Sequence, residues 1–213
     1  MGVGIGSYDD NMLESLANRG DGNYVYIDSE KEAKRVFVDE LSATLNVIAS
    51  DVKIQVEFNE DRVTRYRQLG YENRQLTKQQ FRDDAVDAGE VGSGQSVTAL
   101  YEMELKGERR EALGVVRVRY RNLDTGDVEE ETFPITPAMV RGAFEKTSDR
   151  FKLALGVAEY AEILRGSPHA KGSTFDDVAR VLVPVGLNLH LDDRVQELVR
   201  QVQLSGSLSR ASE

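Results

Sequence analysis

The chain has 213 residues, of which 40% are hydrophobic and 30% are charged, and it contains no cysteine. This length allows one or two compact domains, and the composition is that of a folded protein rather than a disordered one. The absence of cysteine excludes disulfides, thiolate catalysis and cysteine-based zinc sites.

The net charge of −10 is unevenly distributed along the chain. Residues 136–213 hold ten basic and ten acidic side chains, so the whole excess of acid lies in residues 1–135. Because nucleic-acid binding needs a basic stripe, we expect no nucleic-acid partner. No apolar run approaches the roughly 18 residues of a membrane span, so we expect none in this chain.

The first fifty residues alternate between strand and helix patterns. Residues 2–6 and 24–28 are short apolar runs typical of strands, and each precedes a segment of helical spacing. Ser29 and Glu32 form a capping box, which predicts a helix from Ser29 to Ile48. This alternation predicts a parallel sheet covered by helices, and two strands alone leave such a sheet incomplete. The segment could pair with its copy in a second chain, dock its helices on the β module of the same chain, or remain largely disordered. Of these we favour a homodimer through residues 1–50.

The chain also opens on a run that has the pattern of a strand already in progress. We expect it to be a fragment from which preceding sequence, including any secretory signal, is missing.

Residues 51–135 predict an antiparallel β module. From Val52 to Phe58 apolar and polar side chains alternate, as in a half-buried strand. Further strands are expected at 62–69, 97–105, 113–120 and 128–135, with a helical turn at 79–85. The last two strands, joined across Asp124–Asp127, form a hairpin. Several strands at this spacing predict a small sandwich.

Residues 136–213 predict a helical region. Thr147 to Asp149 offer N-caps for a helix that runs to Leu164. Ser173 and Thr174 precede Asp176 and Asp177, which is the capping signature of a second helix. We expect Pro184 to limit that helix, because proline cannot donate a helical hydrogen bond. A third helix carries apolar residues from Leu191 to Val202, and the small polar end from Ser205 is expected to fray.

Several stretches of this chain are distinctive: GVGIGSYD (2–9), LANRGDGNYVYID (16–28), RVTRYR (62–67), GYENRQL (70–76), SVTALY (96–101) and residues 151–167. Together they resemble the C-terminal part of bacterial von Willebrand factor A-domain proteins of the YfbK kind. The resemblance implies that residues 1–50 are the last two strand–helix units of the A domain. The residues from 51 onward would be the family's own uncharacterised C-terminal domain. The expected class is therefore α+β, with a remnant of a parallel sheet, a β-sandwich-like module and a helical region packed on it.

The resemblance also bears on metals and cofactors. An A domain binds a hard cation such as Mg²⁺ through an Asp-x-Ser-x-Ser motif with a Thr and an Asp, all in its earlier strands and loops. That motif is absent from this sequence. We therefore expect no metal site, no cofactor and no catalytic residue in this chain.

Other motifs have simpler explanations. Arg19-Gly20-Asp21 spells an adhesion tripeptide, but a glycine helix cap followed by a turn explains it. The glycines from Gly89 to Gly94 lead into a strand, whereas a phosphate loop leads into a helix. The acidic side chains from Asp83 to Glu90 lack the spacing of a calcium loop and indicate a solvated face.

The two histidines and the arginines also give no clear indication of a functional site. His169 and His190 have no evident nucleophile or metal-ligand partner in the sequence, and we expect a surface loop and a helix entry for them. The basic side chains that begin at Arg62 are interleaved with acids, which favours salt-bridged strands over nucleic-acid contact. They are Arg62, Arg65, Arg67, Arg74 and Arg82.

Two functions from different classes remain. We expect a non-catalytic protein-interaction or structural module of a larger A-domain protein in the bacterial cell envelope or periplasm, with an unidentified protein partner. The alternative is a carbohydrate-active or other hydrolase domain that uses paired carboxylates from Asp83, Asp84, Glu102 or Glu104. Such a pair needs two carboxyls that face one cleft at roughly 5–10 Å, one with a raised pKa.

Overall fold

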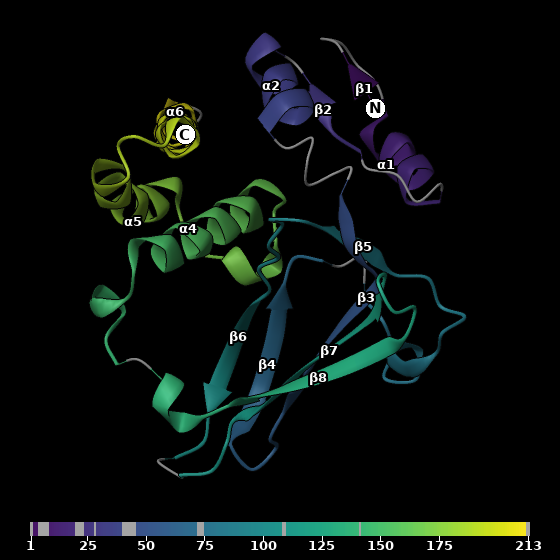
Figure 1. The fold of residues 1–213 in the computed structure, drawn as a ribbon. Coiled ribbons are helices and arrows are strands. Elements are labelled where there is room, and N and C mark those ends of the chain that lie inside the picture. Colours follow the sequence, from purple (N-terminus) through teal and green to yellow (C-terminus); the bar gives the residue numbers. More distant parts are fainter. Residues whose placement is uncertain are drawn as a thin grey trace. The chain divides into compact units, whose positions relative to one another are not determined.

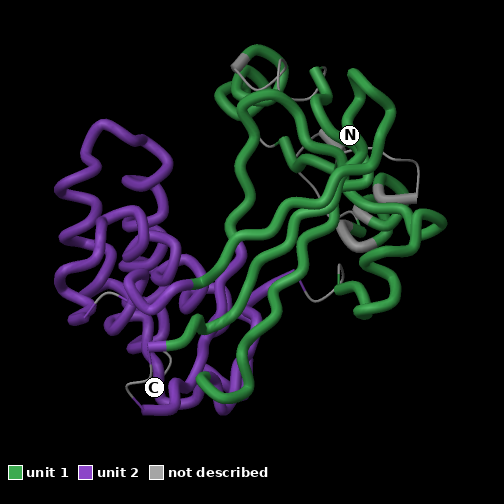
Figure 2. The backbone as a smooth tube through the Cα atoms, turned by 60° about the horizontal axis from the view of Figure 1, so that its bottom comes forward, with its two compact units in different colours: residues 1–62, 73–98, 111–135 green, residues 63–72, 99–110, 136–213 purple. Residues whose placement is uncertain are grey.

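The computed structural model describes residues 2–3, 9–19, 24–27, 29–39, 46–71, 75–107, 110–140 and 142–211. It contains both helices and antiparallel sheets, which confirms the α+β class (Figure 1). The chain divides into two compact units whose segments interleave along the sequence (Figure 2). Unit 1 comprises residues 1–62, 73–98 and 111–135, and unit 2 comprises residues 63–72, 99–110 and 136–213.

The N-terminal strands and helices follow the predicted order. β1 (Gly2–Val3) pairs in parallel with β2 (Tyr26–Ile27). α1 (Asp10–Arg19) begins after Asp9, whose carboxylate accepts a hydrogen bond from the amide of Met12 at 3.0 Å. α2 (Glu30–Lys34) begins after Ser29, whose hydroxyl accepts from the amide of Glu32. The parallel pairing and the predicted start of the second helix at Ser29 are confirmed.

The predicted extension of the second helix to Ile48 is wrong. α2 passes into a π-helical turn, η1 (Arg35–Asp39), and the long strand β3 (Val47–Phe58) already includes Ile48. The β-branched pair Val47 and Ile48 prefers extended backbone, and β3 pairs with its neighbours from its first residue. Residues 40–45 lie outside the described part of the chain.

Unit 1 is built on a four-stranded antiparallel sheet with the order β5-β3-β7-β8. β7 (Gly114–Asn122) and β8 (Val128–Ile135) form the predicted hairpin, and Gly126 takes a φ of +79° in its turn. β5 (Gly89–Gly92) was not predicted as a strand. It is four residues long, and a glycine at each end hides its strand pattern.

The two faces of this sheet differ in chemistry because side chains alternate along each strand. One face carries Arg117, Arg119 and Lys53, and the opposite face carries Val116 and Val118. A turn that contains η3 (Gln80–Arg82) lies against the charged face. Its Phe81 is buried, and the ammonium of Lys53 donates to the carbonyl of Asp83 at 2.6 Å. The helical turn predicted at 79–85 is confirmed.

Unit 2 combines a strand pair with three long helices. β4 (Val63–Leu69) and β6 (Leu100–Leu105) pair antiparallel, as two of the predicted strands. α4 (Asp149–Leu164) is capped by Ser148, and α5 (Phe175–Asn188) by a complete capping box between Thr174 and Asp177. α6 (Asp193–Ala211) is the third long helix. Short 3-10 turns occur at η4 (Pro137–Met139), η5 (Phe144–Lys146) and η6 (Pro168–Ala170).

The helices of unit 2 share an apolar core. Val178, Leu182 and Val202 are buried, and Leu153, Ile163 and Leu198 are among the residues packed around them. α4 approaches α5 closely at Gly156, where a Cβ would overlap the side chain of Leu182. Tyr160 makes an edge-on ring contact with Phe175 at 5.8 Å and a hydrogen bond to Ser205 at 2.9 Å.

Two expectations about the C-terminal helices are wrong. Pro184 does not limit its helix, because α5 continues to Asn188 and buries Val185, the residue directly after the proline. This burial offsets the hydrogen bond that proline cannot donate. The end of the chain is helical to Ala211 rather than frayed from Ser205. Arg210 pairs with Asp176 of α5 at 2.5 Å, which holds the last turn of α6.

The division of the chain at residues 50 and 136 stays a prediction. The sandwich also stays a prediction, because it requires the β4–β6 pair to stack on the four-stranded sheet, and these belong to different units.

We expect Gly114→Ala to destabilise the protein by roughly 1–3 kcal/mol, because the new methyl group would overlap the carbonyl oxygen of Glu57 in the neighbouring strand. Backbone atoms paired in a sheet cannot move aside as a side-chain tip can. The matched control is Gly89→Ala, another strand glycine, where a Cβ meets no atom within 4 Å. Urea unfolding of both variants measures the effect, and equal stabilities would contradict this account of the packing.

Candidate functional site

A ladder of ion pairs runs along one face of the β4–β6 pair. Arg65 and Arg67 on β4 stand opposite Glu104 and Glu102 on β6 in the strand register. Arg65 donates through Nη2 to Glu104 at 2.7 Å, and Arg67 donates through Nη2 to Glu102 at 2.8 Å. The four charges share a face because they are two residues apart on each strand.

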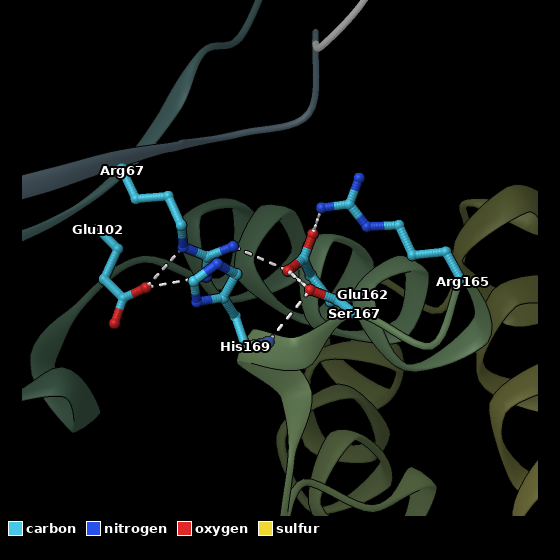
Figure 3. Close-up of polar contacts among 6 residues, drawn as sticks. All are labelled: Arg67, Glu102, Glu162, Arg165, Ser167 and His169. Atoms are coloured by element: carbon cyan, nitrogen blue, oxygen red, sulfur yellow. Dashed lines mark hydrogen bonds and ion pairs between the residues drawn. The ribbon is translucent and has the colours of Figure 1, made fainter.

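Arg67 extends this ladder to the helical part of unit 2. Its Nη1 donates to Oε2 of Glu162, on the last turn of α4, at 2.8 Å (Figure 3). Glu162 is almost fully buried, with 5% of its side chain exposed. It also accepts from the hydroxyl of Ser167 at 2.7 Å and pairs with Arg165 one turn later. Ser167 in turn accepts from the backbone amide of His169 at 3.3 Å.

The surroundings of Glu162 favour its charged form. Burial alone would raise the pKa of this carboxyl. The hydrogen bonds from Ser167 and Arg67 and the charges of Arg165 and Arg67 outweigh burial and hold the pKa below its usual value. Burial also disfavours the charged form of Arg67, which for a cation means a lower pKa. The hydrogen bonds of Arg67 to Glu102 and Glu162 outweigh burial and raise its pKa overall. The cluster is thus a set of polar and charged partners around one buried carboxylate.

Chemically, this arrangement is suited to holding elements together. A general acid needs a carboxyl that stays protonated near neutral pH, which requires a raised pKa. Glu162 has the opposite shift, and the contacts of Arg67, Arg165 and Ser167 occupy its oxygens. We interpret the cluster as a clamp between α4 and the β4–β6 pair.

The four carboxylates considered for a hydrolase fall into two sets. Glu102 and Glu104 lie in unit 2, on the same strand face as predicted, and each binds an arginine. Asp83 and Asp84 lie in unit 1. A hydrogen bond from Arg119, at 2.7 Å, lowers the pKa of Asp84, and the carboxylate of Asp83 accepts from the amide of Ala85 at 3.0 Å.

Three arginines of this stretch, Arg65, Arg67 and Arg82, are salt-bridged, as the interleaved acids predict. Besides Arg65 and Arg67, Arg82 holds both oxygens of Glu130 at 2.8 and 3.1 Å. Arg62 is buried and donates to the carbonyl of Glu111 at 3.0 Å. Arg74 lies outside the described residues.

The remaining motifs adopt the simpler structures. Gly89 begins strand β5, and Gly94 takes a φ of +80° in a turn rather than a phosphate loop. His169 and His190 are exposed, in a 3-10 turn and in the turn between α5 and α6 respectively. Gly20 and Asp21 of the adhesion-like tripeptide lie outside the described part of the chain.

Within the residues that the structure describes, no three His, Asp or Glu side chains come together to hold a metal ion. Nor does any helix in these ranges have the length and apolarity to cross a membrane.

Sequence reasoning missed Glu162 and Ser167. The available signal was a carboxylate next to Ile163 on an otherwise apolar helix face, followed three residues later by Arg165. The partner that makes Glu162 structurally important, Arg67, is 95 residues away and could not be paired with it from spacing alone.

Comparison with known proteins yields relatives whose role is not described. The family whose sequence model matches residues 43–113 and 104–207 is described as “Uncharacterized protein YfbK, C-terminal”. The curated “Uncharacterized protein YfbK” of Escherichia coli (strain K12) is 32% identical over 196 residues, which covers 83% of this chain and 33% of that protein. The chain thus spans about a third of the length of this relative. No solved structure matches.

We expect Glu162→Gln to lower the free energy of unfolding at neutral pH by roughly 1–3 kcal/mol, because Arg67 and Ser167 lose a charged acceptor. Glu102→Gln is the matched control, since it removes the other acid bound by the same arginine. Glu102 is 68% exposed, so its loss should cost less than about 1 kcal/mol. Chemical denaturation measures both variants, and similar losses would contradict the clamp.

The pH dependence provides a second readout for the same pair. Because the folded protein lowers the pKa of Glu162 below its ordinary value of 4.5, its charge stabilises the fold above that pH. This contribution is lost as the pH falls through the lower, folded-state pKa. The difference in the free energy of unfolding between wild type and Glu162→Gln should therefore become smaller as the pH is lowered from 7 to about 3. A gap that is constant with pH would mean that packing, not charge, causes the loss.

Proposed function

We propose that this chain, which belongs to the family described as “Uncharacterized protein YfbK, C-terminal”, is a non-catalytic protein-interaction or structural module of a larger protein. The match covers a third of the Escherichia coli relative, and two thirds of that protein lie outside the matched region. This supports the proposal that the chain is one part of a larger protein. A domain of this kind contributes surfaces and rigidity to its parent rather than a complete reaction centre.

The observation that carries the non-catalytic part is the ion pairing of the candidate carboxylates. Glu102, Glu104 and Asp84 each accept a hydrogen bond from an arginine at 2.7–2.8 Å. The hydrogen bond from Arg119 lowers the pKa of Asp84, whereas a hydrolase of the paired-carboxylate type needs one carboxyl with a raised pKa. The buried carboxyl, Glu162, is likewise held in its charged form.

We propose further that the parent is a bacterial von Willebrand factor A-domain protein of the cell envelope or periplasm. In this proposal residues 1–50 are the last two strand–helix units of the A domain. The parallel pairing of β1 with β2 supports it, because parallel neighbours joined through a helix are typical of that architecture. Residues 1–42 also precede the region that the family model matches.

Enzyme assays and cross-linking test the two halves of the proposal. We expect the chain to hydrolyse aryl glycosides and aryl esters no faster than a Glu102→Gln/Glu104→Gln variant, because neither carboxylate acts as an acid or a nucleophile. In the full-length parent protein, replacing residues 51–213 by a flexible linker should remove specific proteins from those cross-linked to the parent in cells. Hydrolysis that these substitutions abolish would contradict the non-catalytic role, and an unchanged cross-linked set would contradict the interaction role.

We also propose that residues 1–50 mediate a homodimer of the isolated chain. Among the described residues, β1 and β2 pair over two residues each. Several apolar side chains of α1 and η1 are exposed, among them Leu16 at 61% and Val38 at 62%. Parallel strands are stable when both faces are covered, which a second copy can supply.

We expect light scattering to give the mass of a dimer for the full chain and of a monomer for a chain that begins at Asn46. A monomeric full chain in which protease leaves residues 1–50 intact would contradict the dimer.

A further inference from the structure

Unit 1 contains a small polar recess on the charged face of its sheet. Its volume is about 210 Å³, and it is lined by Gln55, Glu57, Lys78, Phe81, Arg82 and Arg117. The strand residues share one face because Gln55 and Glu57 are two positions apart on β3, and Gln55 pairs with Arg117 on β7. The buried ring of Phe81 anchors the turn that supplies the other side.

Positive charge exceeds negative charge in this recess, although the chain as a whole carries −10. Three of the lining side chains are cationic and only Glu57 is anionic. A second acid, Glu130, lies against Arg82 at 2.8 Å and Arg117 at 3.8 Å, and with it one excess positive charge remains. The two outer cations are the most accessible, with Lys78 80% and Arg82 63% exposed.

The outer cations retain donors for an incoming group. Arg82 binds the two oxygens of Glu130 through Nε and Nη2, so its Nη1 can serve another acceptor. The ammonium of Lys78 lies 3.5 Å from Glu57, which is longer than an ordinary hydrogen bond, so this pair is loose. The amide of Gln55 adds a neutral donor in the same recess.

We propose that this recess binds the carboxylate of an acidic side chain presented by a partner protein. The inference rests on the proposed interaction role and names the chemistry that one of its surfaces recognises. The incoming carboxylate accepts from Nη1 of Arg82 and from the ammonium of Lys78. A polyanion such as nucleic acid fits poorly, because its neighbouring charges would meet Glu57, Glu130 and Asp84 on the same face.

NMR titration of the isotopically labelled full chain with a short peptide that carries one glutamate among neutral residues tests this site. We expect the amide signals of Lys78, Phe81 and Arg82 to shift, and Lys78→Gln/Arg82→Gln to weaken binding at least about tenfold, equivalent to about 1.4 kcal/mol. The matched control, Arg180→Gln/Arg200→Gln, removes two other exposed arginines that are paired with acids, and it should leave the affinity unchanged.

One further variant and two further ligands test the site. Lys78→Gln alone, whose side chain is the most exposed of the set, should weaken binding without changing the circular dichroism spectrum. Acetate should shift the same signals at higher concentration, and the same peptide with glutamine in place of its glutamate should shift none. Peptide shifts outside the recess, equal losses in the control variant, or no shift at millimolar peptide would overturn the site. The cross-linking experiment on the parent would still test the interaction role by itself, because it does not use this peptide.

Discussion

The structure of unit 2 depends on one buried ion pair, between Glu162 on α4 and Arg67 on β4. A carboxylate with 5% of its side chain exposed is costly to bury unless donors surround it. Arg67, Arg165 and Ser167 supply those donors from a strand, a helix end and the turn that follows it. The hydrogen bonds to the Glu162 carboxylate therefore hold the strand, the helix end and the turn in fixed positions relative to one another. Apolar packing has no such dependence on direction.

Unit 1 repeats this arrangement at its surface. Arg117, Arg119 and Arg121 follow one face of β7, and each pairs with an acid from another element of the unit. Since these pairs are partly solvated, each contributes little stability. The arginine partners lower the pKa of Glu57 and of Asp84. An excess of acid spread over residues 1–135 thus coexists with locally balanced or positive surfaces.

Local rules predicted most of the fold, and contacts distant in sequence account for the failures. The capping box at Thr174 and the alternation from Val52 to Phe58 were sufficient because their signals lie within a few residues. Pro184 inside α5 contradicts a local rule, and packing around Val185 offsets its effect. The helix predicted to Ile48 failed because strand pairing, which the local pattern does not contain, begins at Val47.

The pairing of β4 with β6 explains why the candidate site was the hardest part to predict. These strands are some thirty residues apart in the chain, and they belong with the helices after 136 rather than with the hairpin between 113 and 135. Once the register places Arg67 opposite Glu102 and within reach of Glu162, the acids that suggested a hydrolase acquire permanent cationic neighbours. The pKa and reactivity of a carboxylate depend on its neighbours in space. Two acids that are two residues apart on a strand can therefore be assigned to a reaction only when the residues opposite them on the neighbouring strand are known.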